Sequence, residues 1–112
     1  NTLADAIVGY TQPVGVGEEA YAQRERIMKL MSKTYELRNI GSNALSIAYV
    51  AADRFQAVVL SNVDEFSLLA GGLIASEAGC LMSDMNGEPR IRQGANLIVS
   101  NPRLLKSLLL KD

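Results

Sequence analysis

The feature that most constrains the fold of this chain is a regular alternation of short apolar runs with longer segments of helical pattern. Short runs rich in β-branched and aromatic residues are typical of strands, and apolar residues three and four positions apart are typical of helices. Strands are expected at residues 5–12, 35–40, 55–61, 80–85 and 95–100. Helices are expected at residues 18–34, 41–53, 65–79 and from Asn101 onward. This order predicts a layered α/β/α domain with a mostly parallel or mixed five-stranded sheet.

The length and composition are those of one domain with a real core. The chain has 112 residues, of which 48% are hydrophobic, so residues 1–112 are expected to form a single α/β domain. The formal net charge is −1 and no basic block is present, which makes nucleic acid and anionic membranes poor partners. No apolar run reaches the roughly 18 residues that a membrane span needs. Because the chain begins at Asn1 and almost directly with a strand, we expect it to be part of a longer protein.

Two residue types narrow the possible chemistry. The chain has no histidine, which excludes Ser-His and Cys-His catalysis and imidazole metal sites within it. Its one cysteine, Cys80, cannot form an internal disulfide. A lone cysteine favours a reducing compartment, so a cytoplasmic location is expected.

The helical segments carry signals for their ends and their buried faces. In residues 18–34 the apolar side chains Tyr21, Ile27, Met28, Leu30 and Met31 are expected to share one packed face. The segments 41–53 and 65–79 are apolar almost all round, which predicts burial on more than one side. Ser42 and Asn101 are expected N-caps, and Gly79 is an expected stop. A pair of glycines inside a helix, Gly71 and Gly72, requires a packing reason.

Three stretches carry polar groups that are candidates for a site. In "LRNIGSNA" a strand with Arg38 leads through Gly41 and Ser42 into a helix N-terminus, which is able to bind a phosphate or a hydroxyl group. Taken alone the motif is weak, and an ordinary strand-to-helix turn with a serine cap is the better explanation of it. Asp64 and Glu65 stand at the next helix start, where they either cap the helix or begin a metal site that needs further ligands from elsewhere. The stretch "SDMNGEP" around Asp84 has the start of a calcium loop without its final glutamate, which favours a tight turn.

Taken in order, three stretches resemble the carboxyl-terminal half of the inositol monophosphatase family. They are "LRNIGSNALSIAYVAADRFQAVV", "FSLLAGGLIASEAGCLMSDMNGEP" and "ANLIVSNPRLLKSLL", and the resemblance runs from about Leu3 to Leu110. It implies a magnesium-dependent hydrolase of phosphate monoesters, with the active site in a cleft facing an amino-terminal half. That other half carries the glutamate and the Asp-x-x-Asp-Gly-Thr segment that bind most of the Mg²⁺ and the phosphate.

The resemblance also assigns roles to positions in this half. It implies that Gly41, Ser42 and Asn43 contact substrate hydroxyls, with Arg38 at a position that is often basic. Asn43 replaces the family's usual alanine and adds a polar group on the substrate side. An acidic residue that accepts a hydrogen bond from a substrate hydroxyl is replaced by Leu60.

A second departure affects the metal site. The family's Trp-Asp pair, whose Asp binds the metal, is replaced by Phe66-Ser67, and a neutral hydroxyl is a poor magnesium ligand. Asp64 would take the ligand's place only if the helix began in a shifted register; capping explains it more simply. The interpretation is therefore the substrate-side half of a magnesium-dependent phosphomonoesterase with a degenerate metal and substrate site.

The alternative is a non-catalytic relative that binds a ligand or a protein. The chain alone is not expected to be active. The expected partners are the amino-terminal half of the fold, a phosphorylated sugar or inositol, and a second copy, since the family commonly forms dimers. The face normally covered by the other half is expected to expose apolar surface in this chain.

Overall fold

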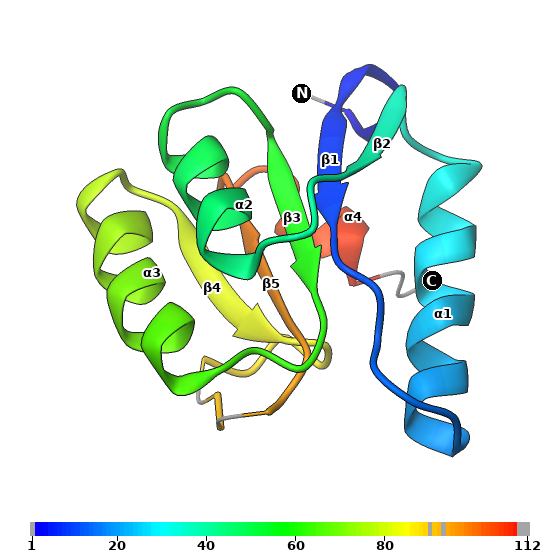
Figure 1. Ribbon diagram of the computed structural model, residues 1–112. Helices are drawn as coiled ribbons and strands as arrows, with labels where there is room; N and C mark the ends of the chain where they lie inside the picture. The colour runs from blue at the N-terminus through cyan, green and yellow to red at the C-terminus, as the bar shows by residue number, and fades with distance from the viewer. Residues whose placement is uncertain (1, 90, 93, 110–112) are drawn as a thin grey trace.

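Five short strands form one mixed sheet in the order β2-β1-β3-β5-β4 (Figure 1). The computed structural model describes residues 2–89, 91–92 and 94–109. β1 (Ile7–Tyr10) lies between β2 (Glu36–Asn39) and β3 (Ala57–Leu60) and is parallel to both. β5 (Leu97–Ser100) is antiparallel to β3 on one side and to β4 (Leu81–Asp84) on the other. The expected mixed five-stranded sheet is confirmed.

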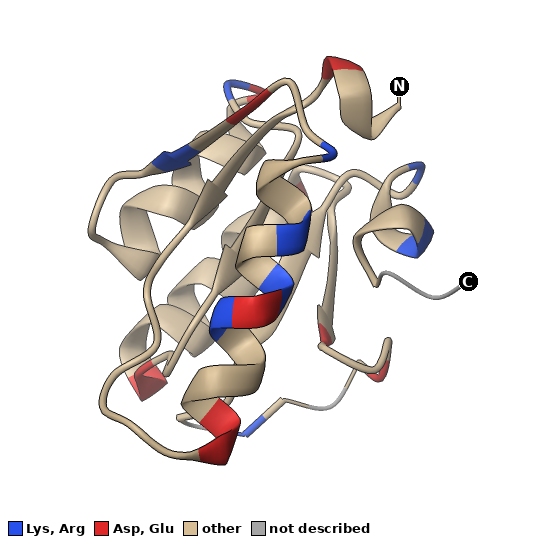
Figure 2. Ribbon diagram, turned by 90° about the vertical axis from the view of Figure 1, so that its right-hand side faces the viewer, with Lys and Arg blue, Asp and Glu red and all other residues tan. Residues whose placement is uncertain are grey.

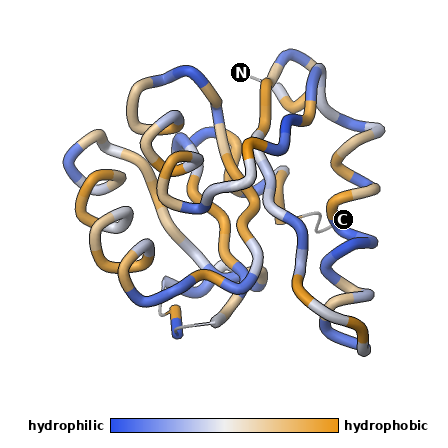
Figure 3. The backbone as a smooth tube through the Cα atoms, viewed as in Figure 1, coloured by the Kyte–Doolittle hydropathy of each residue, from blue (hydrophilic) through white to orange (hydrophobic). Residues whose placement is uncertain are grey.

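Helices cover both faces of the sheet, which makes three layers (Figure 1). α1 (Glu18–Met31) and α4 (Leu105–Leu108) lie on one face, and α2 (Asn43–Ala51) and α3 (Glu65–Glu77) lie on the other. A short 3₁₀ helix, η1 (Leu3–Asp5), precedes β1. Because successive side chains of a strand point to opposite faces, β3 contributes to a separate hydrophobic cluster on each side. The expected layered α/β/α fold is confirmed, and Figure 3 shows the hydrophobic strands at its centre.

Local sequence signals set most of the helix ends as expected. The hydroxyl of Ser42 accepts a hydrogen bond from the Leu45 amide at 3.1 Å and caps α2. Gly79 follows the last residues of α3 with a φ of 78°, a left-handed conformation that glycine adopts without strain. The last helix begins later than predicted, since α4 starts at Leu105 and Asn101 is not its N-cap. The side chain of Asn101 instead accepts hydrogen bonds from the amides of Arg103 and Leu104 and stabilises the turn before α4. The expected extension of that last helix to residue 111 falls partly outside the described residues.

The packed face of α1 differs from the prediction. The buried residues of this helix are Gln23, Ile27 and Leu30. Tyr21, Met28 and Met31, which were expected on the packed side, are exposed. The reason is that Gln23 has a buried hydrogen-bond partner, the hydroxyl of Ser61 directly after β3, which lies 38 residues away in sequence. This bond satisfies the polar side chain of Gln23 on the packed side of α1. Apolar periodicity alone does not predict such a partner.

The close approach of α2 and α3 explains one of the two interior glycines. A Cβ atom at Gly71 would lie 2.3 Å from Cδ1 of the buried Ile47 on α2, closer than two carbon atoms can approach. At Gly72 the nearest atom to a Cβ would be Cε of Met82 at 3.7 Å, which is an ordinary contact. Gly71 therefore has the packing reason that the sequence required, whereas the space around Gly72 does not demand glycine.

The outward side of the α2–α3 layer is apolar and uncovered. Phe66, Leu69 and Leu73 on α3 are exposed, as is Leu45 on α2. Burial of these helices on more than one side is therefore not observed in this chain, which exposes apolar surface here. None of the helices in the described part of the chain has both the length and the apolar character that crossing a membrane requires.

Candidate functional site

The carboxyl ends of the three parallel strands meet at one edge of the sheet. The β1–β2 connection places α1 on one face, and the β2–β3 connection places α2 on the other. From β1 the chain adds β2 on one side and then returns to add β3 on the other side, so the order of strands reverses next to β1. In open α/β sheets, ligands bind in the crevice at such a switch point. A pocket of about 310 Å³ lies there, lined by Thr11, Gln12, Val14, Asn39, Gly41, Asn43, Ser61 and Asn62. None of these lining residues carries a charge.

The turn after β2 places two of the predicted residues at this pocket. Gly41 has a φ of 74°, and its amide donates a hydrogen bond to Oδ1 of Asn39 at 2.8 Å. This left-handed turn is what brings Ser42 into position to cap α2. The hydroxyl of Ser42 is occupied by that cap, so the turn offers mainly backbone at Gly41 to a ligand in the pocket.

Asn43 is held by a hydrogen-bonded network that joins all three layers. The Thr11 hydroxyl donates to Oδ1 of Asn43 at 2.8 Å, and Nδ2 of Asn43 donates to the Ser61 carbonyl at 3.4 Å. The Ser61 amide donates to the Thr11 hydroxyl, and the Ser61 hydroxyl donates to the Thr11 carbonyl, both at 2.9 Å. Gln23 of α1 completes the network by donating to the Ser61 hydroxyl at 3.3 Å. The Asn43 amide lines the pocket with both of its polar atoms engaged by the protein.

Sequence reasoning did not single out Thr11 and Ser61, which line the pocket, or Gln23, which supports Ser61 from α1. All three are buried, and Gln23 has no exposed surface. A signal was present for two of them, because Thr11 follows β1 directly and Ser61 follows β3 directly. Gln23 carries no such signal, since its role depends on a contact with a distant strand. A buried polar network whose members are all satisfied fixes their relative positions tightly.

Arg38 is not brought to this pocket. It lies exposed on the edge strand β2, where its Nε donates to Oε2 of Glu36 at 2.5 Å. The hydrogen bond and the negative charge of Glu36 raise the pKa of Arg38 above its usual value. Its side chain is thus paired along the strand edge, on the far side of the turn from Asn43.

Leu60 occupies the strand end where the family resemblance places a hydroxyl-binding acid. Its side chain has no exposed surface and belongs to the hydrophobic cluster between the sheet and the α2–α3 layer. The side chain of Leu60 is therefore part of the hydrophobic core in this chain. It provides no acceptor for a hydrogen bond from a substrate hydroxyl.

Asp64 acts as the N-cap of α3. Its Oδ2 accepts a hydrogen bond from the Ser67 amide at 3.1 Å. Hydrogen bonds from the side chain and the backbone of Ser67 lower the pKa of Asp64 below its ordinary value. Ser67 itself is buried and is turned toward Asp64. The Asp64 carboxylate is therefore engaged in capping α3, and Glu65, in the first turn of α3, is the carboxylate nearest in sequence to Ser67.

The residues present do not by themselves fit a magnesium ion. Mg²⁺ requires several oxygen ligands in octahedral geometry, usually with one or two carboxylates. Within the part of the chain that the structure describes, no three acidic or cysteine side chains converge to hold a metal. The Asp84 carboxylate is likewise used locally, since its Oδ1 accepts from the amides of Asn86 and Glu88. The tight turn expected there is confirmed.

The Asp64 cap predicts an acid-dependent loss of stability. Because its pKa is lowered on folding, Asp64 stabilises the fold above the ordinary aspartate pKa of about 3.9, and this stabilisation is lost as pH falls through the lowered value. Asp64→Ala is expected to lower the melting temperature near neutral pH and to reduce the further loss on acidification below about pH 4. Asp64→Asn keeps a neutral cap, so its melting temperature should stay close to that of the unmodified chain. Thermal melts from neutral pH to strong acid, followed by circular dichroism, test this, and equal melting temperatures for Asp64→Ala and Asp64→Asn at neutral pH would argue against the cap.

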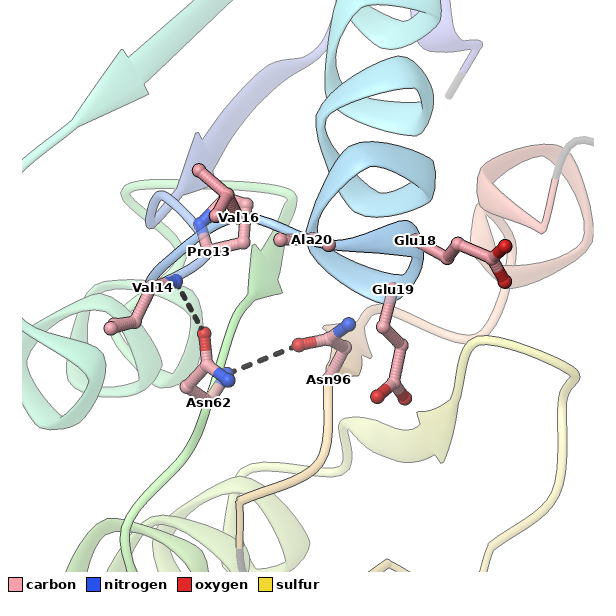
Figure 4. Close-up of a pocket in the computed structure, with 9 residues that line it drawn as sticks. Pro13, Val14, Val16, Glu18, Glu19, Ala20, Asn62 and Asn96 are labelled. Carbon is pink, nitrogen blue, oxygen red and sulfur yellow. Dashed lines mark hydrogen bonds between the residues drawn. The ribbon is translucent and has the colours of Figure 1, made fainter.

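A second pocket lies beside the first, at the N-terminus of α1 (Figure 4). Asn62 separates the two and takes a strained left-handed φ of 53°. The side-chain Oδ1 of Asn62 accepts a hydrogen bond from the backbone amide of Val14 at 2.7 Å. The backbone amide of Asn62 donates a hydrogen bond to Oδ1 of Asn96 at 3.1 Å. Asn62 thus fixes the loop after β1 against the end of β3 and the start of β5, which keeps the strand-end pocket in shape.

The family model that matches this chain describes the inositol monophosphatase family and covers residues 3–112. Among curated proteins, the Nus factor SuhB of Vibrio cholerae is 34% identical over 89 residues, which is 76% of this chain and 33% of that protein. The Nus factor SuhB of Escherichia coli K12 is 35% identical over 81 residues, which is 72% of this chain and 30% of that protein. The chain therefore spans about a third of the length of these relatives.

Solved structures agree with the fold. The extragenic suppressor protein SuhB of Bartonella henselae superposes with a TM-score of 0.85 and 28% identity, covering 97% of this chain and 42% of that one. An IMPase of Thermotoga maritima superposes with a TM-score of 0.77 and 25% identity, covering 97% of this chain and 41% of that one.

Proposed function

The chain belongs to the inositol monophosphatase family, and from this membership we propose that it is the substrate-side half of a two-half, magnesium-dependent phosphomonoesterase whose metal and substrate sites are degenerate. Its substrate is a phosphorylated sugar or inositol. The polyol part of that substrate rests in the pocket at the carboxyl ends of β1, β2 and β3.

The character of the pocket is the observation that carries this proposal. Its lining offers the side-chain amides of Gln12 and Asn39 and the backbone of Gly41, and no charge. Such groups bind the hydroxyls of a neutral polyol well, because each can donate or accept a hydrogen bond. They provide no countercharge for a phosphate, which agrees with the phosphate lying outside this pocket, toward the half that carries the metal ligands.

The metal ligands are assigned to the amino-terminal half. The family generally uses Mg²⁺, whereas this chain has Ser67 where a carboxylate is needed and uses Asp64 as a helix cap. When bound, Mg²⁺ would polarise the phosphate ester and activate water. The contribution of this chain is to bind and orient the polyol, and its isolated form is accordingly inactive.

The exposed side of the α2–α3 layer is the surface that we assign to the amino-terminal half. Phe66, Leu69 and Leu73 are spaced so that they share one side of α3, and all three are exposed. A contiguous apolar surface of this kind is typical of a covered interface. This apolar surface is on α3, the helix that also carries Ser67 and is capped by Asp64. An amino-terminal half docked on α3 would therefore approach the strand-end pocket from the α2–α3 face of the sheet.

A non-catalytic binding protein is the second candidate, and one observation favours it. Two positions at which the family resemblance places a carboxylate have neutral side chains, Leu60 in the core and Ser67 with a hydroxyl, and both side chains are buried. In that case the pocket retains ligand binding without hydrolysis.

A cytoplasmic location is compatible with both candidate functions. It is supported by the free thiol of Cys80, whose pKa is raised chiefly by burial.

The test is a phosphate-release assay on a polypeptide that joins this chain to its amino-terminal half. Inositol monophosphate and a panel of other sugar phosphates would be supplied with and without Mg²⁺. We expect Mg²⁺-dependent release from the joined protein and none from the 112-residue chain alone. Gln12→Ala, which removes an exposed amide from the pocket, should raise KM with little change in kcat, because it removes binding that is equal in ground and transition states.

Calorimetric titration with inositol monophosphate separates the two candidates. Binding without release would support the non-catalytic version. Neither release nor binding of any member of the panel would contradict both.

A further inference from the structure

Two pockets at the carboxyl ends of the strands share one wall. The strand-end pocket of about 310 Å³ and the pocket of about 270 Å³ at the N-terminus of α1 are both lined by Val14 and Asn62. Val14 lies on the loop after β1, and Asn62 follows the end of β3. Because both pockets use this pair as lining, the Val14–Asn62 pair forms the partition between them.

One side-chain hydrogen bond closes the partition. Oδ1 of Asn62 accepts from the backbone amide of Val14 at 2.7 Å, although the two residues are 48 positions apart in sequence (Figure 4). The side chain of Val14 is 76% exposed, so packing does little to hold it in place. Its position depends on hydrogen bonds to the backbone instead. Besides Asn62, Arg24 contributes to these by donating to the carbonyls of Pro13 and Gly15, the two neighbours of Val14.

The Asn62 side of the partition is fixed by the sheet. The backbone amide of Asn62 is bonded to Asn96, and the preceding residue, Ser61, belongs to the buried network with Thr11. Asn62 and Asp53 are the two non-glycine residues with a positive φ in the described part of the chain. Such a conformation is costly and persists where the surroundings enforce it, often at functional sites. Asn62 thus holds an exposed loop from a rigid base.

The pocket beyond the partition is also suited to hydroxyl groups. Its lining includes Glu18 and Glu19 in the first turn of α1, and Figure 2 shows acidic residues at that end of the helix. Carboxylates accept hydrogen bonds from hydroxyls, whereas they repel a phosphate. A second sugar ring would therefore be compatible with this pocket if the partition did not separate it from the first.

We propose that Asn62 is a specificity-determining residue of the strand-end site: by holding Val14 in place, it limits the site to substrates with one polyol ring and excludes those with two. This role rests on the function proposed above and adds to it the size of the substrate. A volume of about 310 Å³ lies at the lower end of the roughly 300–1,000 Å³ that ligand pockets span. Without the partition the site would open into the neighbouring 270 Å³, which provides room for a second ring.

Three variants separate this role from a purely structural one. Glycine adopts a positive φ without strain, so Asn62→Gly keeps the turn and removes the bond to Val14. Its melting temperature should stay close to that of the unmodified protein, because relief of strain offsets the lost hydrogen bond. Asn62→Asp retains an acceptor oxygen and should keep the partition. Asp53→Gly relieves strain at a φ of 61° outside both pockets and is the matched control.

The experiment compares inositol monophosphate with trehalose 6-phosphate, a sugar phosphate with two rings, on the protein that joins this chain to its amino-terminal half. Phosphate release in the presence of Mg²⁺ gives kcat/KM for each compound, and their ratio measures the preference for one ring. We expect Asn62→Gly to lower this ratio by about tenfold or more. Asn62→Asp and Asp53→Gly should keep the ratio of the unmodified protein.

The outcomes distinguish this inference from the proposed function. An unchanged ratio in Asn62→Gly, or an equal fall in Asp53→Gly, would overturn the role of Asn62 and leave the phosphatase function standing. If the joined protein releases no phosphate, calorimetric titration of the same two compounds gives the preference as a ratio of dissociation constants, to which the same expectations apply. Binding of neither compound would overturn this inference together with the polyol pocket itself.

Discussion

Leu60→Glu is expected to destabilise the chain by about 3 to 5 kcal/mol at neutral pH, the usual cost of a buried charge without a partner. Leu60 has no exposed surface and packs with Ile47, Val63 and Leu97 between the sheet and α2–α3. Those neighbours are apolar, so the introduced carboxylate would find no hydrogen-bond donor among them. The substitution would restore the type of residue that the family resemblance places at this strand end.

The pH dependence of this variant identifies the cause. Burial disfavours the charged form and raises the pKa of the introduced carboxyl above its value in the unfolded chain. The stability of the variant is then highest below the unfolded pKa of about 4.3 and is lost as pH rises through the folded value. Urea denaturation at acidic and neutral pH measures the difference. Leu60→Met, which conserves volume, should cost less than about 1.5 kcal/mol at either pH; an equal cost for both variants would refute the account of Leu60 as a core residue.

The consequence for function is that the lost hydroxyl acceptor cannot be regained by one substitution. The space at the end of β3 is filled by an apolar cluster, and a carboxylate there requires its neighbours to change as well. The remaining polar groups of the pocket, such as Gln12 and Asn39, must then carry any discrimination between substrates.

Features set by neighbouring residues in sequence were predictable. The caps at Ser42 and Asp64 and the stop at Gly79 depend on groups within a few residues, and the structure confirms each of them. The order of strands and helices followed from apolar periodicity, and their alternation predicted a mostly parallel or mixed five-stranded sheet, of which the structure shows the mixed form. The strand-end pocket was partly foreseen, because the turn at Gly41 leads into a helix at the edge of the sheet.

Features set by distant contacts were not predictable. The Thr11–Ser61 pair is 50 residues apart in sequence and is formed only because β1 and β3 are neighbours. The buried side of α1 was assigned wrongly because Gln23, a polar residue, is buried by its bond to Ser61. Arg38 was expected near the substrate side, but its nearest opposite charge is Glu36 on the same strand edge. None of these three pairings can be predicted from apolar periodicity.

Ser67→Asp carries the second large expected effect, because it supplies the carboxylate that the metal site lacks. In the protein that joins this chain to its amino-terminal half, we expect the variant to bind Mg²⁺ at least about tenfold more tightly than the unmodified protein, roughly 1.4 kcal/mol. The helix dipole at the first turn of α3 favours a negative charge, whereas burial and the neighbouring Asp64 carboxylate disfavour it, so the variant is expected to be less stable without Mg²⁺ than with it. Ser76→Asp, an exposed position on the same helix, is the matched control and should leave Mg²⁺ affinity unchanged.

Calorimetric titration of Mg²⁺ into the joined protein, its Ser67→Asp variant and its Ser76→Asp control is therefore the most direct test of a degenerate metal site. The account predicts weak binding in the unmodified protein, about tenfold tighter binding for Ser67→Asp, and no gain for Ser76→Asp. Equal Mg²⁺ affinity with and without the carboxylate at position 67 would contradict it, since the site would then be complete without that ligand.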